Sequence, residues 1–591
     1  MCGIVGLVGS QEASEALQIL ERMTDRHRSR GPDGVGYWQT DHASFGHCRL
    51  AVIDPTNSSD QPFVRHDLYL TIVFNGCIYN YQKLRSQLKA DGYEFTSNGD
   101  TEVILCAYDK WKERCVDHFE GMFAFAVFDH KNNSLFLARD RIGIKPLYYT
   151  LHDETLIFSS TLPPLLRAMS QSVEIDKTGL CLALNYRCGV PGANTIIQGI
   201  KKVEPGTFIR FVDGVAQSEK YWSLGDFYSD EQLNLPVPVL EKQFFDLLRD
   251  AILQRTTVTD VSYGLFLSGG IDSTILLAVM REVTENVKSF SIGFNSWNDE
   301  AGDEFYYSDL AAQEFSSDHH KIFIEDDEIV SELDGCISAM SEPLMSEDAI
   351  GFYLLSRFAS NHVKVVLCGQ GADEILGGYS WYHRITDRGN WALLYGALRR
   401  DRSSSEYQSL VMPEFRDDND VAQVLLEAFE SQYSSLDATA KTLLADTTIT
   451  LPEDPLKRVD NMTMAFGLEG RVPFCDHRLV EFCARMPSAA KVAGGIGKKI
   501  LHSSCNDKLP DEIITRKKGA FPVPAITQSS PAIRQIIGDT LTSTEAKQRG
   551  IFNYQLVDKW VASPEKYLTP IMQSKLWQVF LMEKWFQINN I

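Results

Sequence analysis

The hydrophobic pattern of this chain changes its period near residue 223, and this change constrains the fold more than any other feature. Before it, short apolar runs such as CGIVGLVG, LYLTIVFNG and MFAFAVFD alternate with turn residues, as in sheets of short strands. Residues 223–236, SLGDFYSDEQLNLP, are polar and aperiodic, and we interpret them as a linker. With 591 residues, the chain can form roughly two to four domains.

The N-terminal region, residues 1–222, also contains helical periodicity. Ala16, Ile19, Leu20 and Met23 are spaced to share one face of a helix after the first strand. The stretch FDHKNNSLFL has two asparagines at its centre, which tolerate the geometry of a hairpin turn. Strand runs with few helices predict stacked sheets that helices cover on their outer faces.

The C-terminal region, residues 237–591, alternates strands with helices. SYGLFLSGG runs into STILLAVMREV, and VKSFSIGF and VKVVLCGQG follow as further apolar strands. Continuous apolar strands between amphipathic helices indicate a parallel, doubly wound α/β sheet. From about residue 440 onward the pattern is mainly helical.

The composition of the chain limits its partners and its compartment. It carries 57 Lys and Arg against 79 Asp and Glu, a net charge of −22, which argues against a broad nucleic-acid or anionic-membrane surface. Its 12 cysteines form no CxxC pair and no zinc-type Cys/His spacing, so we interpret them as reduced thiols. The sequence shows no signal peptide and no apolar run long enough to span a bilayer. We therefore expect a cytoplasmic protein with no nucleic-acid and no membrane partner.

Cys2 lies one residue from the start of the sequence, inside the strand-like run MCGIVGLVG. The ordinary interpretation is a core cysteine, because free cysteine packs as a small hydrophobic residue. The alternative is that Met1 is removed, which leaves Cys2 with a free α-amine beside its thiol. Such a residue combines a nucleophile and a base, as in enzymes with an N-terminal threonine.

The motif SGGIDS, residues 268–273, lies between an apolar strand and an amphipathic helix. Glycines let backbone N–H groups approach an anion, and a helix N-terminus favours negative charge. The carboxylate of Asp272 would repel a phosphate unless it held Mg²⁺ against it. A plain glycine turn is the alternative, and the motif is not a Walker A loop, because no GK[ST] follows.

A second acidic loop, GQGADE at residues 369–374, closes another apolar strand. In an open parallel sheet, ligands bind at the carboxyl ends of the strands. We therefore expect both loops to face one crevice, where Asp272 and Asp373 are candidate joint magnesium ligands.

These motifs resemble those of the glutamine-hydrolysing asparagine synthetase family over nearly the whole chain. Residues 1–222 resemble the class II glutaminase domain, an α+β N-terminal-nucleophile fold with an αββα sandwich, through MCGIVG, RGPDG (30–34), RLAVID (49–54), FNGCIYN (74–80), GDTEV (99–103) and ARDRIGIKPLYY (138–149). Residues 237–591 resemble the PP-loop ATP pyrophosphatases, an α/β fold of the adenine nucleotide alpha hydrolase type with a helical C-terminal portion. The second resemblance rests on FLSGGIDS, SIGF (291–294), GQGADEILGGY, LEGRVPFCDHRLVEF (468–482) and RKKGAFPVP (516–524).

The resemblance assigns roles in the N-terminal half. Cys2 would attack the side-chain amide of glutamine, with its own α-amine relaying the proton. The side chain of Asn75 and the backbone N–H of Gly76 would stabilise the oxyanion. Arg49 would bind the α-carboxylate of glutamine and Asp100 its α-amine. The alternative for Arg49 is a surface salt bridge.

In the C-terminal half, the resemblance implies that ATP activates a carboxylate as an acyl-adenylate with release of pyrophosphate. Ammonia would then reach the adenylate through an internal passage. The residues implied in ATP binding are Leu267, Ser268, Gly269, Gly270, Asp272, Ser273, Ile292, Gly369 and Lys498, with Lys499 as a register alternative to Lys498.

Four residues depart from the family pattern. Cys77 stands where glutamate is usual, Gly470 where valine is common, and His502 where arginine is common. Gln370 stands where asparagine synthetases often carry glutamate, although other family members carry GQGADE. Gln370 is placed at the acceptor end of the site. Because an amide cannot take up a proton at neutral pH, Gln370 weakens the case for aspartate as the acceptor.

The leading hypothesis is a glutamine-dependent amidotransferase that uses ATP and Mg²⁺, with aspartate to asparagine as the best single reaction. A second hypothesis keeps the chemistry and changes the carboxylate acceptor, which Gln370 and Gly470 favour. A third is an intramolecular amide-forming cyclase of the β-lactam type, against which the intact set around Cys2 argues. A homodimer is compatible with each of these hypotheses.

Overall fold

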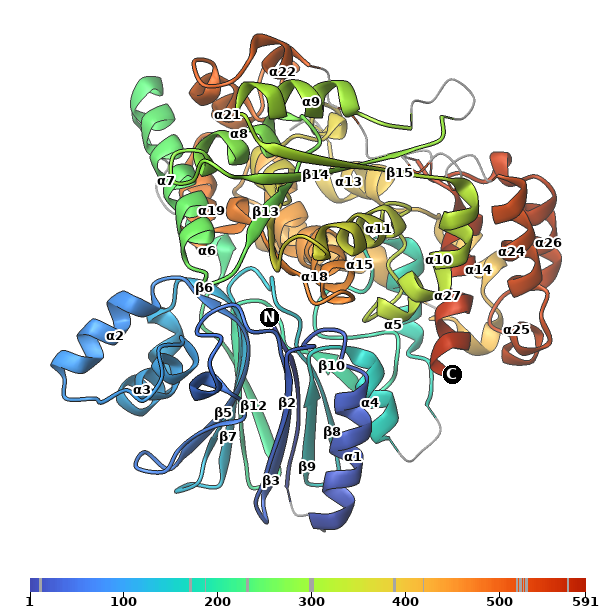
Figure 1. The fold of residues 1–591 in the computed structure, drawn as a ribbon. Helices are drawn as coiled ribbons and strands as arrows, with labels where there is room; N and C mark the ends of the chain where they lie inside the picture. The colour runs from blue at the N-terminus through green and yellow to red at the C-terminus, as the bar shows by residue number, and fades with distance from the viewer. Residues whose placement is uncertain are drawn as a thin grey trace.

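The computed structural model describes the chain except residues 10–12, 170–172, 187, 230–232, 297–301, 386–388, 418, 517–518, 520–522, 524–525, 527–529 and 571–572. Much of the RKKGAFPVP motif therefore lies outside the described residues. Two halves lie against each other, and the N-terminus lies at their junction (Figure 1).

The N-terminal half is a sandwich of two antiparallel six-stranded sheets. The first sheet has the order β10 (Ile200–Lys202), β8 (Tyr148–His152), β9 (Thr155–Ser159), β1 (Gly3–Val8), β3 (Ala43–Arg49) and β2 (Gly34–Gln39). The second has the order β12 (Val215–Lys220), β11 (Thr207–Val212), β7 (Ser134–Arg139), β6 (Gly121–Asp129), β5 (Leu70–Ile78) and β4 (Phe63–Arg65).

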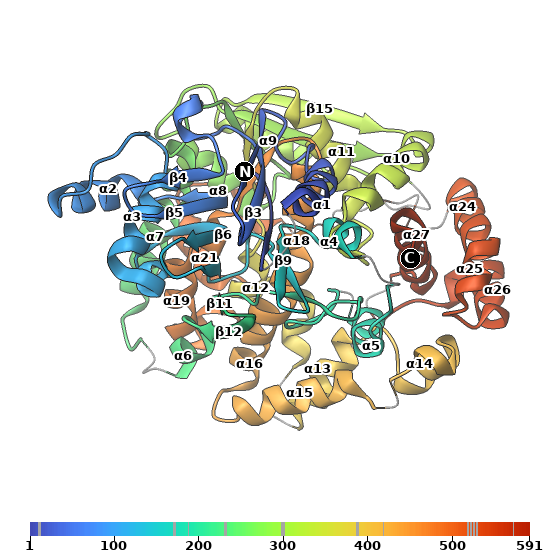
Figure 2. The same ribbon diagram turned by 90° about the horizontal axis from the view of Figure 1, so that it is seen from below.

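Helices cover both outer faces of this sandwich, as the strand pattern predicts. α1 (Ala13–Asp25) and α4 (Leu162–Ala168) pack on the first sheet, and α3 (Thr101–Trp111), beside α2 (Tyr81–Ala90), packs on the second (Figures 1 and 2). The predicted helical face of α1 is confirmed, because Ala16, Ile19, Leu20 and Met23 are all buried. The predicted FDHKNNSLFL hairpin is confirmed as the β6–β7 connection, where Asn133 has a φ of +45°.

The C-terminal half is built on a parallel five-stranded sheet. Its order is β15 (Asp318–Ile324), β14 (Lys288–Phe294), β13 (Tyr263–Phe266), β16 (Val365–Leu367) and β17 (Glu469–Arg471). The chain moves outward in one direction from β13 and returns to add β16 on its other side, so the switch point lies between β13 and β16. The doubly wound parallel sheet predicted from the sequence is confirmed.

Helices surround this sheet and continue beyond it. α8 (Ile271–Met280) follows β13, and α9 (Phe305–Glu314) and α11 (Ala349–Ser360) lie on opposite sides of β14 and β15 (Figure 1). The later part of the chain is mainly helical, with α13 (Trp391–Arg399), α15 (Val421–Gln432), α16 (Ala438–Ala445), α18 (Pro455–Met464), α19 (His477–Arg485), α21 (Lys499–Cys505), α22 (Asp511–Thr515), α24 (Pro531–Leu541), α26 (Tyr554–Ala562) and α27 (Lys575–Asn589).

Part of the segment interpreted as a linker is helical. α6 (Leu224–Ser229) lies within it and packs on α16 and α19 of the C-terminal half. Just before α6, the indole Nε1 of Trp222 donates to Glu481 over 2.8 Å. After the linker, α7 (Val237–Thr257) leads into β13.

Buried charges join the two halves. Asp460, on α18, is 1% exposed and accepts a hydrogen bond of 2.8 Å from Arg30 and one of 3.0 Å from Lys145. Arg30 and Lys145 both belong to the N-terminal half. The largest cluster of buried hydrophobic side chains among the described residues also spans both halves, so hydrophobic packing continues across their junction.

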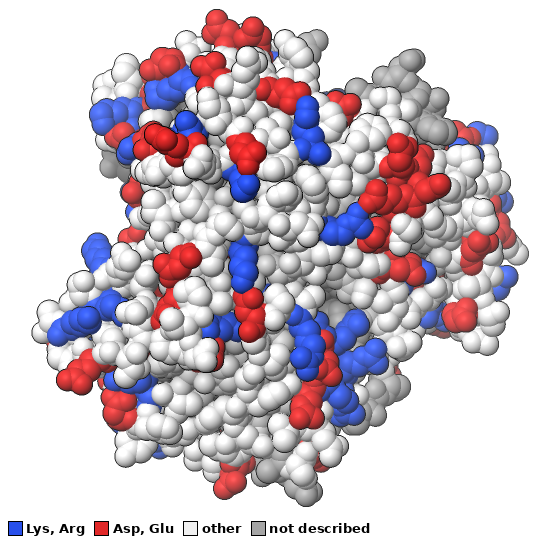
Figure 3. Space-filling view, viewed as in Figure 1, with Lys and Arg blue, Asp and Glu red and all other residues white. Residues whose placement is uncertain are grey.

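Acidic and basic side chains are mixed on one face of the protein. Figure 3 shows acidic and basic side chains interspersed over the described residues of one face. Among the described residues, no helix has both the length and the apolar character needed to cross a bilayer. All twelve cysteines are buried free thiols.

Candidate active sites

The first candidate site surrounds Cys2, just before β1. Cys2 is 7% exposed, and its backbone N–H donates to Oδ1 of Asn75 over 3.0 Å. Arg49, Gly76 and Asp100 line the same small pocket of about 30 Å³. The structure therefore brings together the five residues that the family resemblance assigns to glutamine.

Asn75 and Gly76 present the features of an oxyanion site. Nδ2 of Asn75 is buried and has no hydrogen-bond partner among the described residues, a state that costs free energy unless a ligand oxygen accepts from it. A Cβ atom at Gly76 would lie 2.2 Å from the carbonyl oxygen of Met122 on β6. Only glycine allows β5 and β6 to approach this closely beside Cys2.

Arg49 and Asp100 place opposite charges on the pocket wall. The Arg49 guanidinium donates to the carbonyl oxygens of Asp54 and Thr56 over 2.6 and 2.9 Å, and to the carboxylate of Asp60 over 2.6 Å. Since Asp60 is 57% exposed, this ion pair is open to exchange with a substrate carboxylate. Burial raises the pKa of Asp100 to about 6. The pocket wall can therefore bind the two ends of a zwitterionic amino acid.

The Cys2 pocket also contains a glutamate from the other half of the chain. Glu469, the first residue of β17, lines the pocket and accepts a hydrogen bond of 3.0 Å from the α-ammonium group of Met1. Burial raises the pKa of the Cys2 thiol, so the thiol requires a base to become a nucleophile. Sequence reasoning missed Glu469, although it lies in the LEGRVPF motif, because nothing local links that motif to Cys2.

The second candidate site is a cavity of about 960 Å³ at the carboxyl ends of the parallel strands. The expectation that the two loops at residues 268–273 and 369–374 share one crevice is confirmed, because both line this cavity. The residues implied in ATP, magnesium and acceptor binding that line it are Leu267, Ser268, Gly270, Asp272, Ser273, Ile292, Gly369, Gln370, Asp373 and Lys498.

Gly269 lies in the same loop, but it faces α9 instead of the cavity. Its φ is +69°, and a Cβ atom there would lie 2.2 Å from the carbonyl carbon of Tyr307. The left-handed backbone and the close approach to α9 both require glycine. Gly269 thus allows the loop to pack closely against α9.

The hydroxyl groups of the SGGIDS loop gather at the start of α8. Oγ of Ser268 and Oγ of Ser273 lie 3.2 Å apart, and the N–H of Gly270 donates to Ser268 over 3.3 Å. α8 begins at the next residue, so its N-terminal backbone N–H groups face the same place. Hydroxyl donors at a helix N-terminus form an anion site.

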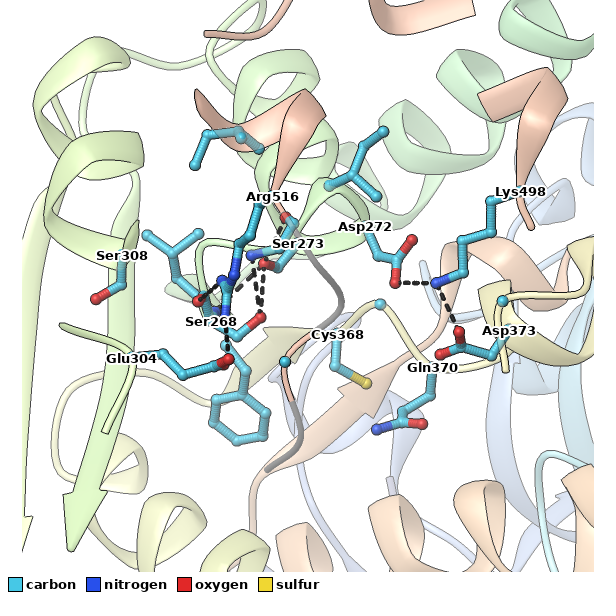
Figure 4. Close-up of a pocket in the computed structure, with 18 of the residues that line it drawn as sticks. Ser268, Asp272, Ser273, Glu304, Ser308, Cys368, Gln370, Asp373, Lys498 and Arg516 are labelled. Atoms are coloured by element: carbon cyan, nitrogen blue, oxygen red, sulfur yellow. Dashed lines mark hydrogen bonds and ion pairs between the residues drawn. The ribbon is translucent and has the colours of Figure 1, made fainter. Parts of the chain in front are cut away.

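Lys498 connects the two acidic loops. Its ammonium group lies 2.5 Å from Oδ2 of Asp272 and 2.8 Å from Oδ1 of Asp373 (Figure 4). The lysine is 5% exposed and has a left-handed backbone, with a φ of +52°. The two carboxylates hold its pKa above the ordinary lysine value, although burial alone would lower it. Lys499, the register alternative, is exposed to solvent.

Arg516 approaches the SGGIDS loop from the opposite side. It forms an ion pair with Glu304 and donates to the carbonyl oxygen of Ser268 over 3.1 Å. In Figure 4, Arg516 and Glu304 lie at one end of the cavity, and Asp373 and Lys498 lie at the other. The cavity therefore has charged groups at both ends.

Gln370 lies in the cavity at the end that carries Asp373 (Figure 4). Its backbone carbonyl oxygen accepts from Sγ of Cys475 over 3.8 Å. His502 also lines the cavity, and burial lowers its pKa. Two of the four departures from the family pattern are thus in the second site.

The other two departures lie outside the cavity lining. Gly470 is on β17, where a Cβ atom would lie 2.6 Å from Cγ1 of Val459 on α18. The glycine therefore accommodates the side chain of Val459. Cys77 is 1% exposed on β5, and burial raises its pKa.

Comparisons with known proteins agree with this geometry. Residues 243–587 match the family model "Asparagine synthase", and residues 1–222 match "Glutamine amidotransferase domain". "Asparagine synthetase [glutamine-hydrolyzing] 3" of Bacillus subtilis is 32% identical over 549 residues, covering 88% of this chain and 87% of that protein. "Asparagine synthetase [glutamine-hydrolyzing] 1" of the same organism is 30% identical over 636 residues, covering 100% of this chain and 97% of that protein.

Among solved structures, the glutamine phosphoribosylpyrophosphate amidotransferase from B. subtilis aligns with a TM-score of 0.30 and 15% identity. The alignment covers 56% of this chain and 92% of that chain, a likeness too low to define a shared fold. The family model at residues 243–587 spans more than half of the chain, and the amidotransferase match precedes it. The chain therefore belongs to the asparagine synthase family and is a glutamine-dependent, ATP-using amidotransferase of the asparagine synthetase type.

Proposed function

We propose that this protein hydrolyses glutamine at Cys2 and transfers the ammonia to an acyl-adenylate formed from ATP and a carboxylate, with aspartate as the leading candidate for the acceptor. The observation that carries the proposal is that Cys2, Arg49, Gly76 and Asp100 line one pocket and that Asn75 accepts a hydrogen bond from Cys2 beside it. The same chain supplies the cavity in which the ammonia would be used.

In the first half-reaction, removal of Met1 frees the α-amine of Cys2. The amine takes the thiol proton as Sγ bonds to the amide carbon of glutamine, and it passes this proton to the leaving nitrogen as the carbon–nitrogen bond breaks to release ammonia. The negative oxygen of the intermediate is stabilised by Nδ2 of Asn75 and the N–H of Gly76. Water then hydrolyses the thioester to glutamate.

In the second half-reaction, a carboxylate oxygen of the acceptor bonds to the α-phosphorus of ATP, and pyrophosphate leaves. Ser268, Ser273 and the start of α8 bind the phosphates. Lys498 neutralises charge on the leaving pyrophosphate. Ammonia then bonds to the acyl carbon and AMP leaves, which gives the carboxamide.

The residues of the cavity fit magnesium. Asp272 and Asp373 point at one shared position, where the Lys498 ammonium now bridges them. Among the described residues, no group of three metal-binding side chains is present. Two carboxylates suit Mg²⁺, which keeps water and substrate phosphates as its other ligands. When bound, the ion would neutralise phosphate charge during adenylation.

The acceptor and the ammonia passage complete the proposal. Gln370 lies at the Asp373 end of the cavity, and we assign this end to the acceptor. An acceptor other than aspartate is the second candidate, and Gln370 is the residue that favours it. We propose that ammonia passes from the Cys2 pocket to the cavity through the interface of the two halves, without meeting bulk water.

The test compares glutamine with ammonium chloride as nitrogen donor. In Cys2→Ala, glutamine-dependent amidation should be abolished while ammonium-driven amidation persists, with pyrophosphate and AMP as products. Cys48→Ala, a buried cysteine outside the pocket lining, should retain both activities. Retention of Met1 in active protein, read by intact mass, or formation of ADP and phosphate would contradict the proposal. A screen of carboxylates, scored by pyrophosphate release, identifies the acceptor.

A further inference from the structure

Glu469 is a residue of the C-terminal half that lies in the pocket of Cys2. It begins β17, an edge strand of the parallel sheet, and is 1% exposed. Cys2, Arg49 and Asp100, which line the same pocket, all come from the N-terminal half. One wall of the Cys2 pocket is therefore a buried carboxylate supplied by the other half of the protein.

An ammonium group is bound to this carboxylate in the structure. The α-ammonium of Met1 donates to Oε2 of Glu469 over 3.0 Å and to the carbonyl oxygen of Leu50 over 3.5 Å. The side chains of Met1 and Glu469 are 0% and 1% exposed, so water has little access to the pair. Oxygen acceptors around one protonated nitrogen are the contacts that a free ammonium ion requires.

Arg471 stabilises the negative charge of Glu469 through the oxygen that does not contact Met1. Oε1 of Glu469 accepts a hydrogen bond of 2.6 Å from Nε of Arg471, which leaves Oε2 as the oxygen that contacts the ammonium group. Burial raises the pKa of Glu469, but the charges of Arg471 and of the Met1 ammonium outweigh it and hold the value at about 2. Glu469 is therefore an anion at neutral pH.

β17 leads from the Cys2 pocket toward the nucleotide cavity. It pairs in parallel with β16, so that Glu469 lies opposite Val365. β16 continues into the loop that carries Gln370, and Cys475, which follows β17, contacts that loop. A three-residue strand spans only about 7 Å between its first and last Cα atoms. Glu469 therefore lines the Cys2 pocket and begins a short strand whose neighbour leads into the cavity loop.

We propose that Oε2 of Glu469 and the carbonyl oxygen of Leu50 form a binding site for the ammonium ion released from glutamine. The inference rests on the proposed function, because it takes ammonia to be produced at Cys2 and used in the cavity. Met1 occupies this site in the structure, so removal of Met1 frees both the Cys2 amine and the ammonium site. The site holds the ion at the interface of the two halves, and no carbon–nitrogen bond is made or broken there. The ion gives up one proton to a phosphate oxygen of the adenylate before its nitrogen bonds to the acyl carbon.

Two other nitrogen groups near Cys2 have acceptors of their own and do not need Glu469. The nitrogen of Cys2 already has an acceptor in Oδ1 of Asn75, at 3.0 Å. The α-ammonium of a bound glutamine has Asp100 on the same pocket wall. If Glu469 served either of these groups, its loss would impair the hydrolysis of glutamine itself.

The first test is Glu469→Gln, which keeps the shape of the side chain and removes its charge. We expect the amide formed per glutamate released to fall about tenfold, as for one lost charge-assisted hydrogen bond, and this ratio does not depend on the rate of glutamine hydrolysis. Glu481→Gln, which alters a glutamate bonded to Trp222 outside the pocket, is the matched control and should keep the wild-type ratio. An unchanged ratio in Glu469→Gln, with or without slower hydrolysis, would overturn the ammonium site.

The second test does not depend on the folding of a variant. Crystals of the protein without Met1 are soaked in a thallium(I) salt, because Tl⁺ is a monovalent cation close in size to ammonium and gives an anomalous signal. A peak beside Oε2 of Glu469 and the Leu50 carbonyl is expected, and its absence would overturn the inference. Failure of the proposed function differs from failure of the ammonium site. In the first case the unchanged protein would hydrolyse no glutamine or form no amide, whereas in the second it would do both.

Discussion

The ammonium group of Lys498 lies 2.5 Å from Oδ2 of Asp272, and the two residues are separated by 226 positions in the sequence. Asp373 contacts the same ammonium group from the other loop. One lysine thus bridges both carboxylates that face the phosphate site, and its single charge offsets only one of their two. Its left-handed backbone, immediately before α21, sets the direction of the side chain.

Replacement of Lys498 by methionine tests its role at the leaving pyrophosphate. We expect amidation with either nitrogen donor to slow by about 100- to 1,000-fold, as for the loss of one group that stabilises transition-state charge. Glutamine hydrolysis should persist, because the lysine does not line the Cys2 pocket. Lys499→Met, at the exposed neighbouring lysine, is the control, and equal effects of both changes would refute the assignment.

Asp272→Asn tests the magnesium proposal. The amide keeps the size of the side chain but loses the charge that an oxygen-ligated cation requires. Synthesis with glutamine or ammonium should be lost, while some glutamine hydrolysis remains. Isothermal titration of Mg²⁺ in the presence of a non-hydrolysable ATP analogue should show weaker metal binding, and unaltered binding would remove Asp272 from the ligand set.

Asp100 gives glutamine use a defined pH dependence. Because burial raises the Asp100 pKa to about 6, its carboxylate is charged above that pH and neutral below it. The free-enzyme pKa appears in kcat/KM, so kcat/KM for glutamine should fall by about tenfold per pH unit below pH 6. Asp100→Asn should remove this inflection, whereas Asp60→Asn should retain it. A profile flat through pH 6 in the unchanged protein would contradict the assignment.

The relation of the two acidic loops could be predicted from the sequence. Ser268–Ser273 and Gly369–Glu374 follow apolar strands, and carboxyl ends of parallel strands meet at one edge of a sheet. The contact of Lys498 with both loops could not, because it depends on the path of more than a hundred intervening residues. Glu469 is similar, since its approach to Cys2 exists only when the two halves are docked.

Gln370→Glu tests which end of the cavity holds the acceptor. The added charge should change acceptor preference or acceptor KM and leave the apparent ATP affinity unaltered, because Gln370 lies at the Asp373 end. The measurement compares aspartate with the best acceptor from the carboxylate screen. An effect confined to ATP affinity would place Gln370 at the nucleotide and remove the main argument against aspartate.

Gly470→Val restores the residue common in the family and tests the packing explanation. The new side chain would enter the space of Val459, whose Cγ1 would lie 2.6 Å from a Cβ atom at residue 470. Overpacking of this kind lowers the free energy of unfolding by about 1–3 kcal/mol, measurable by urea unfolding. Adding Val459→Ala should recover part of the loss. Gly538→Ala, where the nearest atom is 3.9 Å away, should not destabilise the protein.

Local pattern also determined which elements were predicted. β1, β5 and β6 are apolar runs in which residues on both faces of the strand are buried. Their sequences therefore carry a strong strand signal. β12, with the sequence VAQSEK, is mostly exposed, and its pairing with β11 gives no hydrophobic pattern to detect. α6 likewise arises inside a polar segment, because the C-terminal half supplies the surface on which it packs.

The shared position of Asp460 between Arg30 and Lys145 limits how this protein can be recombined. Each of the two cations is buried, and a buried charge that loses its partner destabilises a protein by about 3–5 kcal/mol. A chimera that joins this amidotransferase half to the synthase half of a relative must therefore carry an acid at the position of Asp460. The two halves can therefore be exchanged between relatives only in pairs that keep this contact between one acid and two buried cations.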